Sequence, residues 1–242
     1  MRPYCSIIIC GAKQMALLEN RMSRPINKRD KVNKTKRSLF IRASLLGAAF
    51  TMLTACNQPS DPSKSGKPTF FSTDITGGDF AKTFALTDHN NQARSMQDFR
   101  GKAVIVFFGF LNCPDICPTA MADWANVLTK LGPEAAKNVQ VLFVTVDPER
   151  DKPDALKNYV TAFNPSYLGL WGDAIATAAT AKAFKVIYAK VRGEKEGSYS
   201  MDHTAASYVF DGNGNMRLYV RHAQPIEQLV SDIQNVLKYP LP

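Results

Sequence analysis

The sequence predicts an α/β fold in which helices flank a mixed central sheet. Two continuous apolar runs, Ala103–Phe108 and Val139–Val146, are rich in β-branched and aromatic residues. Such runs are typical of parallel strands that are buried on both faces. Each run is followed by a segment with helical spacing of apolar residues, Thr119–Leu131 and Pro153–Phe163. This alternation of strands and helices favours a single sheet with parallel central strands.

Weaker patterns predict the remaining elements of the domain. A Gly- and Asn-rich turn at Asp211–Gly214 indicates that the strands on either side of it form an antiparallel hairpin. The other predicted elements, in chain order, are a strand at Phe84–Leu86, a helix at Ala174–Phe184, strands at Val186–Val191, Ala206–Phe210 and Arg217–Val220, and a helix at Ile226–Leu237.

The positive charge of the chain is confined to its N-terminal part. The formal net charge is +9, but residues 1–55 contain eleven Lys and Arg against two acidic residues, and residues 56–242 contain nineteen of each. Because the later part carries no net charge, we exclude nucleic acid as a partner of the folded domain.

The N-terminal part has the features of a bacterial lipoprotein export signal. A basic region precedes the apolar run 43–55, which is shorter than the ~20 residues that a membrane span needs. The run ends in Leu53-Thr54-Ala55-Cys56, which resembles a lipobox and predicts lipidation of Cys56. We therefore expect an export signal at 1–55, a lipid anchor with a flexible tether at 56–75, and a folded domain at 76–242. The protein would sit on the bacterial cell membrane and face the periplasm, with inner or outer membrane left open.

After export, two cysteines remain as free thiols. Cys113 and Cys117 follow the strand Ala103–Phe108 directly and precede a helix, which is how thioredoxin-like folds present sulfur chemistry. The Cα atoms of residues four apart on a helical turn are about 6 Å apart, so the pair permits either a disulfide or joint binding of a soft cation. The positive helix end is expected to lower the pKa of these thiols. We predict a thioredoxin-like fold with insertions.

Two thiolates underfill a metal site, so a third ligand is expected. Of the three histidines, His89 and His222 are interpreted as structural, whereas His203 lies where a late loop can return to the cysteines. Two thiolates with one imidazole suit copper, and Cu(I) accepts three ligands readily. Zinc would require a fourth ligand. Asp147 is either a carboxylate beside the metal or a turn-forming residue before proline.

Several separate motifs are spread along the domain. They are Phe84-Ala85-Leu86-Thr87-Asp88-His89, Phe99-Arg100-Gly101-Lys102, Phe108-Gly109-Phe110, Cys113-Pro114-Asp115-Ile116-Cys117-Pro118-Thr119, Val146-Asp147-Pro148-Glu149-Arg150-Asp151 and Asp202-His203-Thr204. Together they give the chain a resemblance to the Sco/SenC family of copper-binding assembly factors for cytochrome c oxidase. The resemblance runs from about Gly78 to Leu237 and implies that Cys113, Cys117 and His203 bind copper.

The resemblance implies a metallochaperone rather than an enzyme. Its cargo would be copper as Cu(I), with Cu(II) as a further state left open. It would receive the ion from a copper donor protein and deliver it to the binuclear copper centre of an oxidase subunit. The alternative is a thiol:disulfide oxidoreductase that reduces the client's copper-ligand cysteines, in which one of the two thiols of Cys113 and Cys117 attacks and the other resolves. A peroxiredoxin-type peroxidase fits poorly, because Phe110 stands where that site has threonine.

Overall fold

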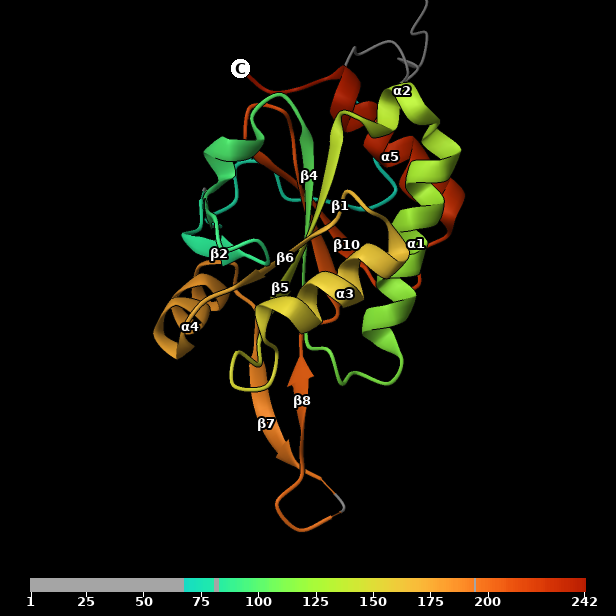
Figure 1. Cartoon of the computed structure of the whole chain (residues 1–242). Helices are drawn as coiled ribbons and strands as arrows, with labels where there is room; N and C mark the ends of the chain where they lie inside the picture. Colours follow the sequence, from blue (N-terminus) through green and yellow to red (C-terminus); the bar gives the residue numbers. More distant parts are fainter. Residues whose placement is uncertain (1–67, 81–82, 194) are drawn as a thin grey trace, which may run out of the picture. The chain divides into compact units, whose positions relative to one another are not determined.

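The computed structural model describes residues 68–80, 83–193 and 195–242 (Figure 1). The predicted export signal, most of the predicted tether and Cys56 lie outside the described residues. Residues 73–74 form a short strand of the main sheet, so the folded domain includes part of the segment that the sequence assigned to the tether. None of the described helices is long and apolar enough to cross a membrane.

The described domain is built on an eight-stranded mixed sheet with the order β1-β10-β9-β4-β5-β6-β2-β3. The central strands β4, β5 and β6 are parallel, and β9 pairs antiparallel to β4, as the prediction of a mixed sheet requires. The strands are β1 (Thr73–Asp74), β2 (Leu86–Asp88), β3 (Ala93–Arg94), β4 (Ala103–Gly109), β5 (Val139–Thr145), β6 (Leu168–Trp171), β9 (Ala206–Phe210) and β10 (Met216–Arg221).

Helices cover the sheet, and α1 and α3 bury apolar residues at the helical spacing that the sequence predicts. Every residue of β4 and β5 is buried, which confirms that both faces of these strands are covered. Helix α1 lies beside α5 (Figure 1), and α3 packs on β6. The helices are η2 (Met96–Phe99), α1 (Ile116–Leu131), α2 (Pro133–Ala136), α3 (Pro153–Phe163), α4 (Ala174–Ala183) and α5 (Ile226–Lys238).

Strand β6 was not predicted from the sequence. Two successive helices were expected, but β6 lies between α3 and α4 and extends the parallel part of the sheet. The strand is only four residues long and contains Gly169, which weakens its strand pattern. A Cβ atom at Gly169 would lie 3.0 Å from Leu156 Cβ, so glycine lets α3 pack closely onto this strand.

The segment that precedes His203 also differs from the prediction. The sequence predicted one strand at Val186–Val191 and a polar loop at Gly193–Ser200. Instead, β7 (Tyr188–Arg192) and β8 (Tyr199–His203) pair as a separate two-stranded sheet. This hairpin projects beyond the main sheet (Figure 1). Polar residues alternate with Tyr199 and Met201 along β8, and only Met201 is buried, so the strand lacks the continuous apolar run used to find the others.

A buried ion pair fixes the turn between β2 and β3. The Asp88 carboxylate accepts hydrogen bonds from the N–H groups of Asn90 and Gln92 and from Arg94 Nε, at 2.8, 3.0 and 2.9 Å. Asn91 has a φ of 61°, a left-handed conformation that asparagine tolerates, which explains why this turn does without glycine. Burial on its own would raise the pKa of Asp88, but these donors outweigh it and lower the pKa.

We expect Asp88→Asn to destabilise the protein at pH 7 by about 1.5–3 kcal/mol, because a buried acceptor loses its charge. A lowered folded-state pKa stabilises the native state above the unfolded-state value of about 3.9. That contribution disappears as the pH falls through the folded-state pKa. Urea unfolding of the original protein and of Asp88→Asn should therefore show a difference in unfolding free energy that narrows below pH 4. The exposed Asp79→Asn should leave stability nearly unchanged, and an Asp88→Asn gap that stays constant with pH would contradict this account.

Candidate metal centre

The cysteine loop lies at the carboxyl end of the central strand β4, where open α/β sheets place their sites. Asp115 is the N-cap of α1, so Cys117 is the second residue of the helix and Pro118 lies in its first turn. Cys113 lies in the preceding turn, and its Sγ accepts a hydrogen bond from Cys117 N at 3.4 Å. Both cysteines are free thiols. The loop therefore presents two sulfurs on one side.

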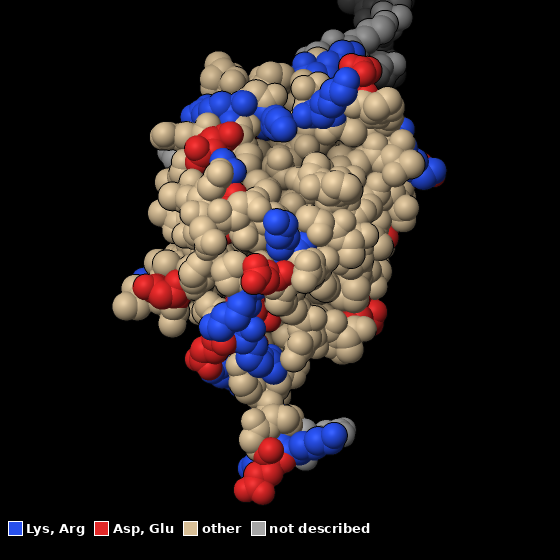
Figure 2. All heavy atoms as spheres, in the orientation of Figure 1, with Lys and Arg blue, Asp and Glu red and all other residues tan. Residues whose placement is uncertain are grey.

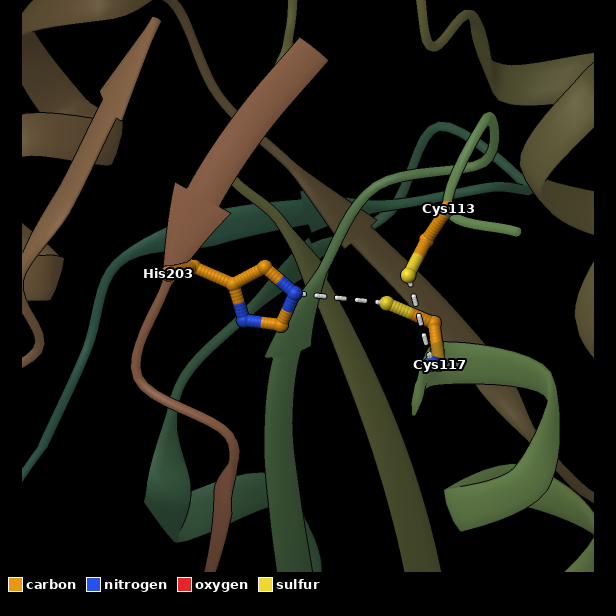
Figure 3. A group of neighbouring side chains, drawn as sticks. All are labelled: Cys113, Cys117 and His203. Carbon is orange, nitrogen blue, oxygen red and sulfur yellow. Dashed lines mark hydrogen bonds between the residues drawn. The ribbon is translucent and has the colours of Figure 1, made fainter. Parts of the chain in front are cut away.

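His203 completes a three-residue cluster with these sulfurs. It is the last residue of β8, and its Nε2 lies 3.4 Å from Cys117 Sγ across 86 positions of sequence. Figure 3 shows the imidazole facing the two sulfur atoms. The ligand atoms of Cys113, Cys117 and His203 all lie within 4.8 Å of one another. In the part of the chain that the structure describes, this is the one such group of three or more His, Cys, Asp or Glu residues.

The imidazole is held in the tautomer that a metal ligand needs. His203 Nδ1 lies 3.2 Å from Thr204 O, and because a carbonyl can only accept, Nδ1 carries the proton. Nε2 then keeps its lone pair toward Cys117. The rings of Phe107 and Phe110 meet the imidazole edge-on, with centroids 6.0 and 5.9 Å away. Burial lowers the pKa of His203 and outweighs the Thr204 carbonyl, so the ring is neutral near pH 7.

The expectation of a lowered thiol pKa is wrong for Cys117. The residue is completely buried, and this burial raises the pKa of its thiol far above the ordinary value. Loss of hydration penalises the thiolate more than the backbone hydrogen bond at Phe110 stabilises it. Cys113 is half-buried and therefore the more accessible of the two sulfurs. In the absence of a cation, Cys117 is a protonated thiol, which is a poor nucleophile.

Gly109, the last residue of β4, leaves the space that the Cys117 sulfur occupies. A Cβ atom at this position would lie 2.8 Å from Cys117 Sγ, 2.8 Å from Phe143 Cε2 and 3.0 Å from Phe107 Cε1. All three neighbours are buried and have little freedom to move. The absence of a side chain at Gly109 therefore lets the sulfur approach the end of the sheet. The sequence placed Gly109 in the motif Phe108-Gly109-Phe110 but did not indicate this role.

The carboxylate next to the cysteine loop is Asp151 rather than Asp147. Asp151 Oδ2 accepts hydrogen bonds from Leu111 N at 3.1 Å and from Thr145 Oγ1 at 2.6 Å. Burial raises the pKa of Asp151. Asp147 instead binds Arg150 and Tyr199, so it faces the hairpin. Among the described residues, no hydrogen bond joins the Asp147 carboxylate directly to Cys113, Cys117 or His203. Sequence spacing did not indicate a role for Asp151, because its partners are a backbone N–H and the hydroxyl of Thr145 at the end of another element.

His89 is structural, as predicted, and His222 lies outside the cysteine cluster. His89 is buried, and its Nδ1 accepts a hydrogen bond from Gly169 N at 3.1 Å. His222 lines a small hollow beside Trp124 and is not part of the cysteine cluster. Met121 is fully buried in the core next to α1's other apolar residues.

Comparisons with known proteins agree with this geometry. A bovine protein, the mitochondrial SCO2 homolog, is 37% identical over 152 residues, covering 62% of this chain and 57% of the bovine protein. The chain thus spans less than two thirds of that relative's length. The SCO2-like protein of Rickettsia felis is 30% identical over 187 residues, covering 76% of this chain and 87% of that protein.

A solved structure and a family model give the same assignment. The structure of Bradyrhizobium japonicum ScoI with copper bound is similar with a TM-score of 0.60 and 35% identity, covering 65% of this chain and 99% of the other. The fold is thioredoxin-like, as predicted. The family model described as SCO1/SenC matches residues 72–238, more than half of the sequence, and the chain therefore belongs to the SCO1/SenC family.

Proposed function

We propose that this protein binds one copper ion as Cu(I) through Cys113, Cys117 and His203. The observation that carries the proposal is the convergence of two sulfurs and one imidazole nitrogen within 4.8 Å at the end of the sheet. The Bradyrhizobium relative, whose solved structure contains copper, supports the choice of metal. Soft thiolates with an imidazole suit Cu(I), and the described residues add no fourth His, Cys, Asp or Glu that zinc would require.

We further propose that the protein hands its copper to the binuclear copper centre of a cytochrome c oxidase subunit. Delivery requires ligands that can be exchanged with those of a partner. The half-buried Cys113 sulfur is the more accessible one, so exchange would begin there, while Cys117 and His203 still hold the ion. Binding also requires loss of the Cys117 proton, so copper affinity should rise with pH.

The proposed place of action is the periplasmic face of a bacterial membrane. The lipobox-like sequence Leu53-Thr54-Ala55-Cys56 supports a lipid anchor on Cys56, followed by a tether. A tethered domain would reach both a copper donor protein and a membrane-bound client. In-cell labelling with a lipid precursor would test the anchor, because Cys56→Ser should abolish incorporation.

An anaerobic Cu(I) titration of the full chain in detergent, against a chromophoric chelator, tests the site itself. We expect one copper per chain. Cys113→Ser, Cys117→Ser and His203→Ala should each weaken binding by at least tenfold, or about 1.4 kcal/mol, because each removes a ligand. His222→Ala removes an imidazole outside the cluster and should bind copper like the original protein. Unchanged affinity in His203→Ala would exclude this residue from the site.

Gly109→Ala should damage the site without removing any ligand. The added methyl group overlaps Cys117 Sγ and two buried rings, which predicts a stability loss of about 1–3 kcal/mol and a displaced sulfur. Copper affinity should fall although all three ligands remain. Gly212→Ala, whose added Cβ would lie 3.3 Å from Gly101 C and far from the cluster, is the control: it should cost less stability than Gly109→Ala and leave copper affinity unchanged. A Gly109→Ala protein with unchanged stability and affinity would rule out the proposed role of this glycine.

The second candidate function is reduction of the client's copper-ligand cysteines. Two free cysteines with neighbouring sulfurs, one of them accessible, favour this reaction. Attack by Cys113 on a client disulfide would form a mixed disulfide, and Cys117 would then release the reduced client and leave a Cys113–Cys117 disulfide. The raised pKa of Cys117 makes the resolving step slow.

A reduction assay with metal-free protein separates the two functions. If copper delivery is the main role, reduction of a client peptide disulfide without copper should be slow, and His203→Ala should not affect it. His203→Ala is expected to have no effect in either case, so the reduction rate itself decides. Fast reduction by the metal-free protein would favour the reductase function instead.

A further inference from the structure

We propose that Asp147 and Arg150 are positioning residues that hold His203 against the two sulfurs. They act through Tyr199, which lies on the same strand, β8, as His203. This inference rests on the proposed function. His203 belongs to the β7–β8 hairpin, which pairs only with itself within the described residues and projects from the body (Figure 1). The main-chain hydrogen bonds of the large sheet therefore do not fix the hairpin. Its side-chain contacts with the body decide where the imidazole lies.

Asp147 and Arg150 hold Tyr199 at three points. The Tyr199 hydroxyl donates to Asp147 Oδ1 at 2.9 Å, and Arg150 Nη1 donates to the Tyr199 carbonyl at 2.9 Å. The Arg150 guanidinium carbon lies 3.7 Å from the centre of the Tyr199 ring, which is a cation–π contact. Arg150 Nε also donates to Asp147 Oδ2, and this carboxylate is completely buried. We call these three residues the hairpin clamp.

The clamp acts on the same face of β8 that carries His203. Tyr199 and His203 are four residues apart on one strand, so their side chains point to the same side, about 13 Å apart. At the His203 end, Thr204 N donates to Ile187 O at 2.9 Å, and Ile187 N donates to Thr204 Oγ1 at 3.0 Å. These bonds close the base of the hairpin. The clamp then sets its tilt, and with it the direction of the imidazole.

The clamp is also joined to the cysteine loop. Thr145 Oγ1 accepts a hydrogen bond from Asp147 N at 2.9 Å and donates to Asp151 Oδ2, which in turn holds Leu111 N. The segment after β5 thus contacts the loop that carries the sulfurs and the hairpin that carries the nitrogen. Through this shared support, the clamp sets the distance between both parts of the copper site.

A neighbouring ion pair provides a matched control. Lys190 on β7 pairs with Glu149 at 2.6 Å, but both side chains are about half exposed or more, so water screens the pair. Figure 2 shows basic and acidic side chains lying close together at this end of the molecule. Lys190→Gln and Arg150→Gln each remove one positive charge over the Tyr199 ring, but only Arg150→Gln also removes the hydrogen bonds to the Tyr199 carbonyl and to Asp147.

The test compares Arg150→Gln with His203→Ala in the full chain in detergent. Residues that orient a metal ligand typically change metal affinity 10–100-fold, and we expect a loss in this range for Cu(I) with Arg150→Gln. X-ray absorption at the copper edge should show two sulfur ligands retained and the nitrogen ligand lost. The double variant Arg150→Gln/His203→Ala should bind no more weakly than His203→Ala alone, because the clamp acts through the imidazole. Lys190→Gln should match the original protein in each measurement.

Two outcomes would overturn the proposal: an Arg150→Gln protein that keeps the copper–nitrogen contact and full affinity, or losses that add in the double variant. If Arg150→Gln does not fold, Tyr199→Phe serves instead, since it removes one hydrogen bond and keeps the ring. NMR of the metal-free protein gives an independent readout. Tyr199→Phe should weaken the contacts of the His203 ring with Phe107 and Phe110, and unchanged contacts would contradict the clamp. Because this readout needs no metal, it holds even if copper binding itself fails.

Discussion

The contact between Cys117 Sγ and His203 Nε2 joins a helix start on the main sheet to a strand end outside it. The two atoms lie 3.4 Å apart, although 86 positions of sequence separate their residues. Each side of the contact has its own support. Gly109 leaves room for the sulfur, and the Phe107 and Phe110 rings confine the imidazole. These supports meet at the carboxyl end of β4, where the ligand atoms of Cys113, Cys117 and His203 lie close together.

Burial gives the site its chemical character. It raises the pKa of Cys117 and lowers that of His203, so both groups favour their neutral forms in the metal-free protein. A soft cation changes this balance, because it replaces the thiol protons and supplies the positive charge that a buried thiolate lacks. The same burial disfavours free thiolate chemistry at Cys117. Burial also makes copper compete with the Cys117 proton, so the proposed site would gain affinity as the pH rises.

The sequence predicted the parts of the fold that local patterns determine. The apolar runs of β4 and β5, the spacing in α1 and α3, and the β9–β10 turn all matched the structure closely. The predicted strand Val186–Val191 overlaps β7, but β6 and β8 were missed because they are short or only partly buried, so tertiary pairing rather than periodicity defines them.

For the site, residue chemistry selected Cys113, Cys117 and His203, and the structure brings these three together. The supporting residues could not be found in this way. Asp151 holds the cysteine loop through the backbone N–H of Leu111, and Gly109 makes room for the sulfur because it has no side chain. Neither role can be predicted from the spacing of residues in the sequence. The sign of the Cys117 pKa shift was also wrong. A helix start is visible in sequence, whereas complete burial of one sulfur depends on packing.

The most direct test of the account is a crystal structure of the copper-loaded protein, with anomalous scattering measured at the copper edge. We predict a single strong anomalous peak at the carboxyl end of β4, within bonding distance of Cys113 Sγ, Cys117 Sγ and His203 Nε2. A peak held by the sulfurs alone with the imidazole turned away, or copper bound elsewhere on the molecule, would contradict it.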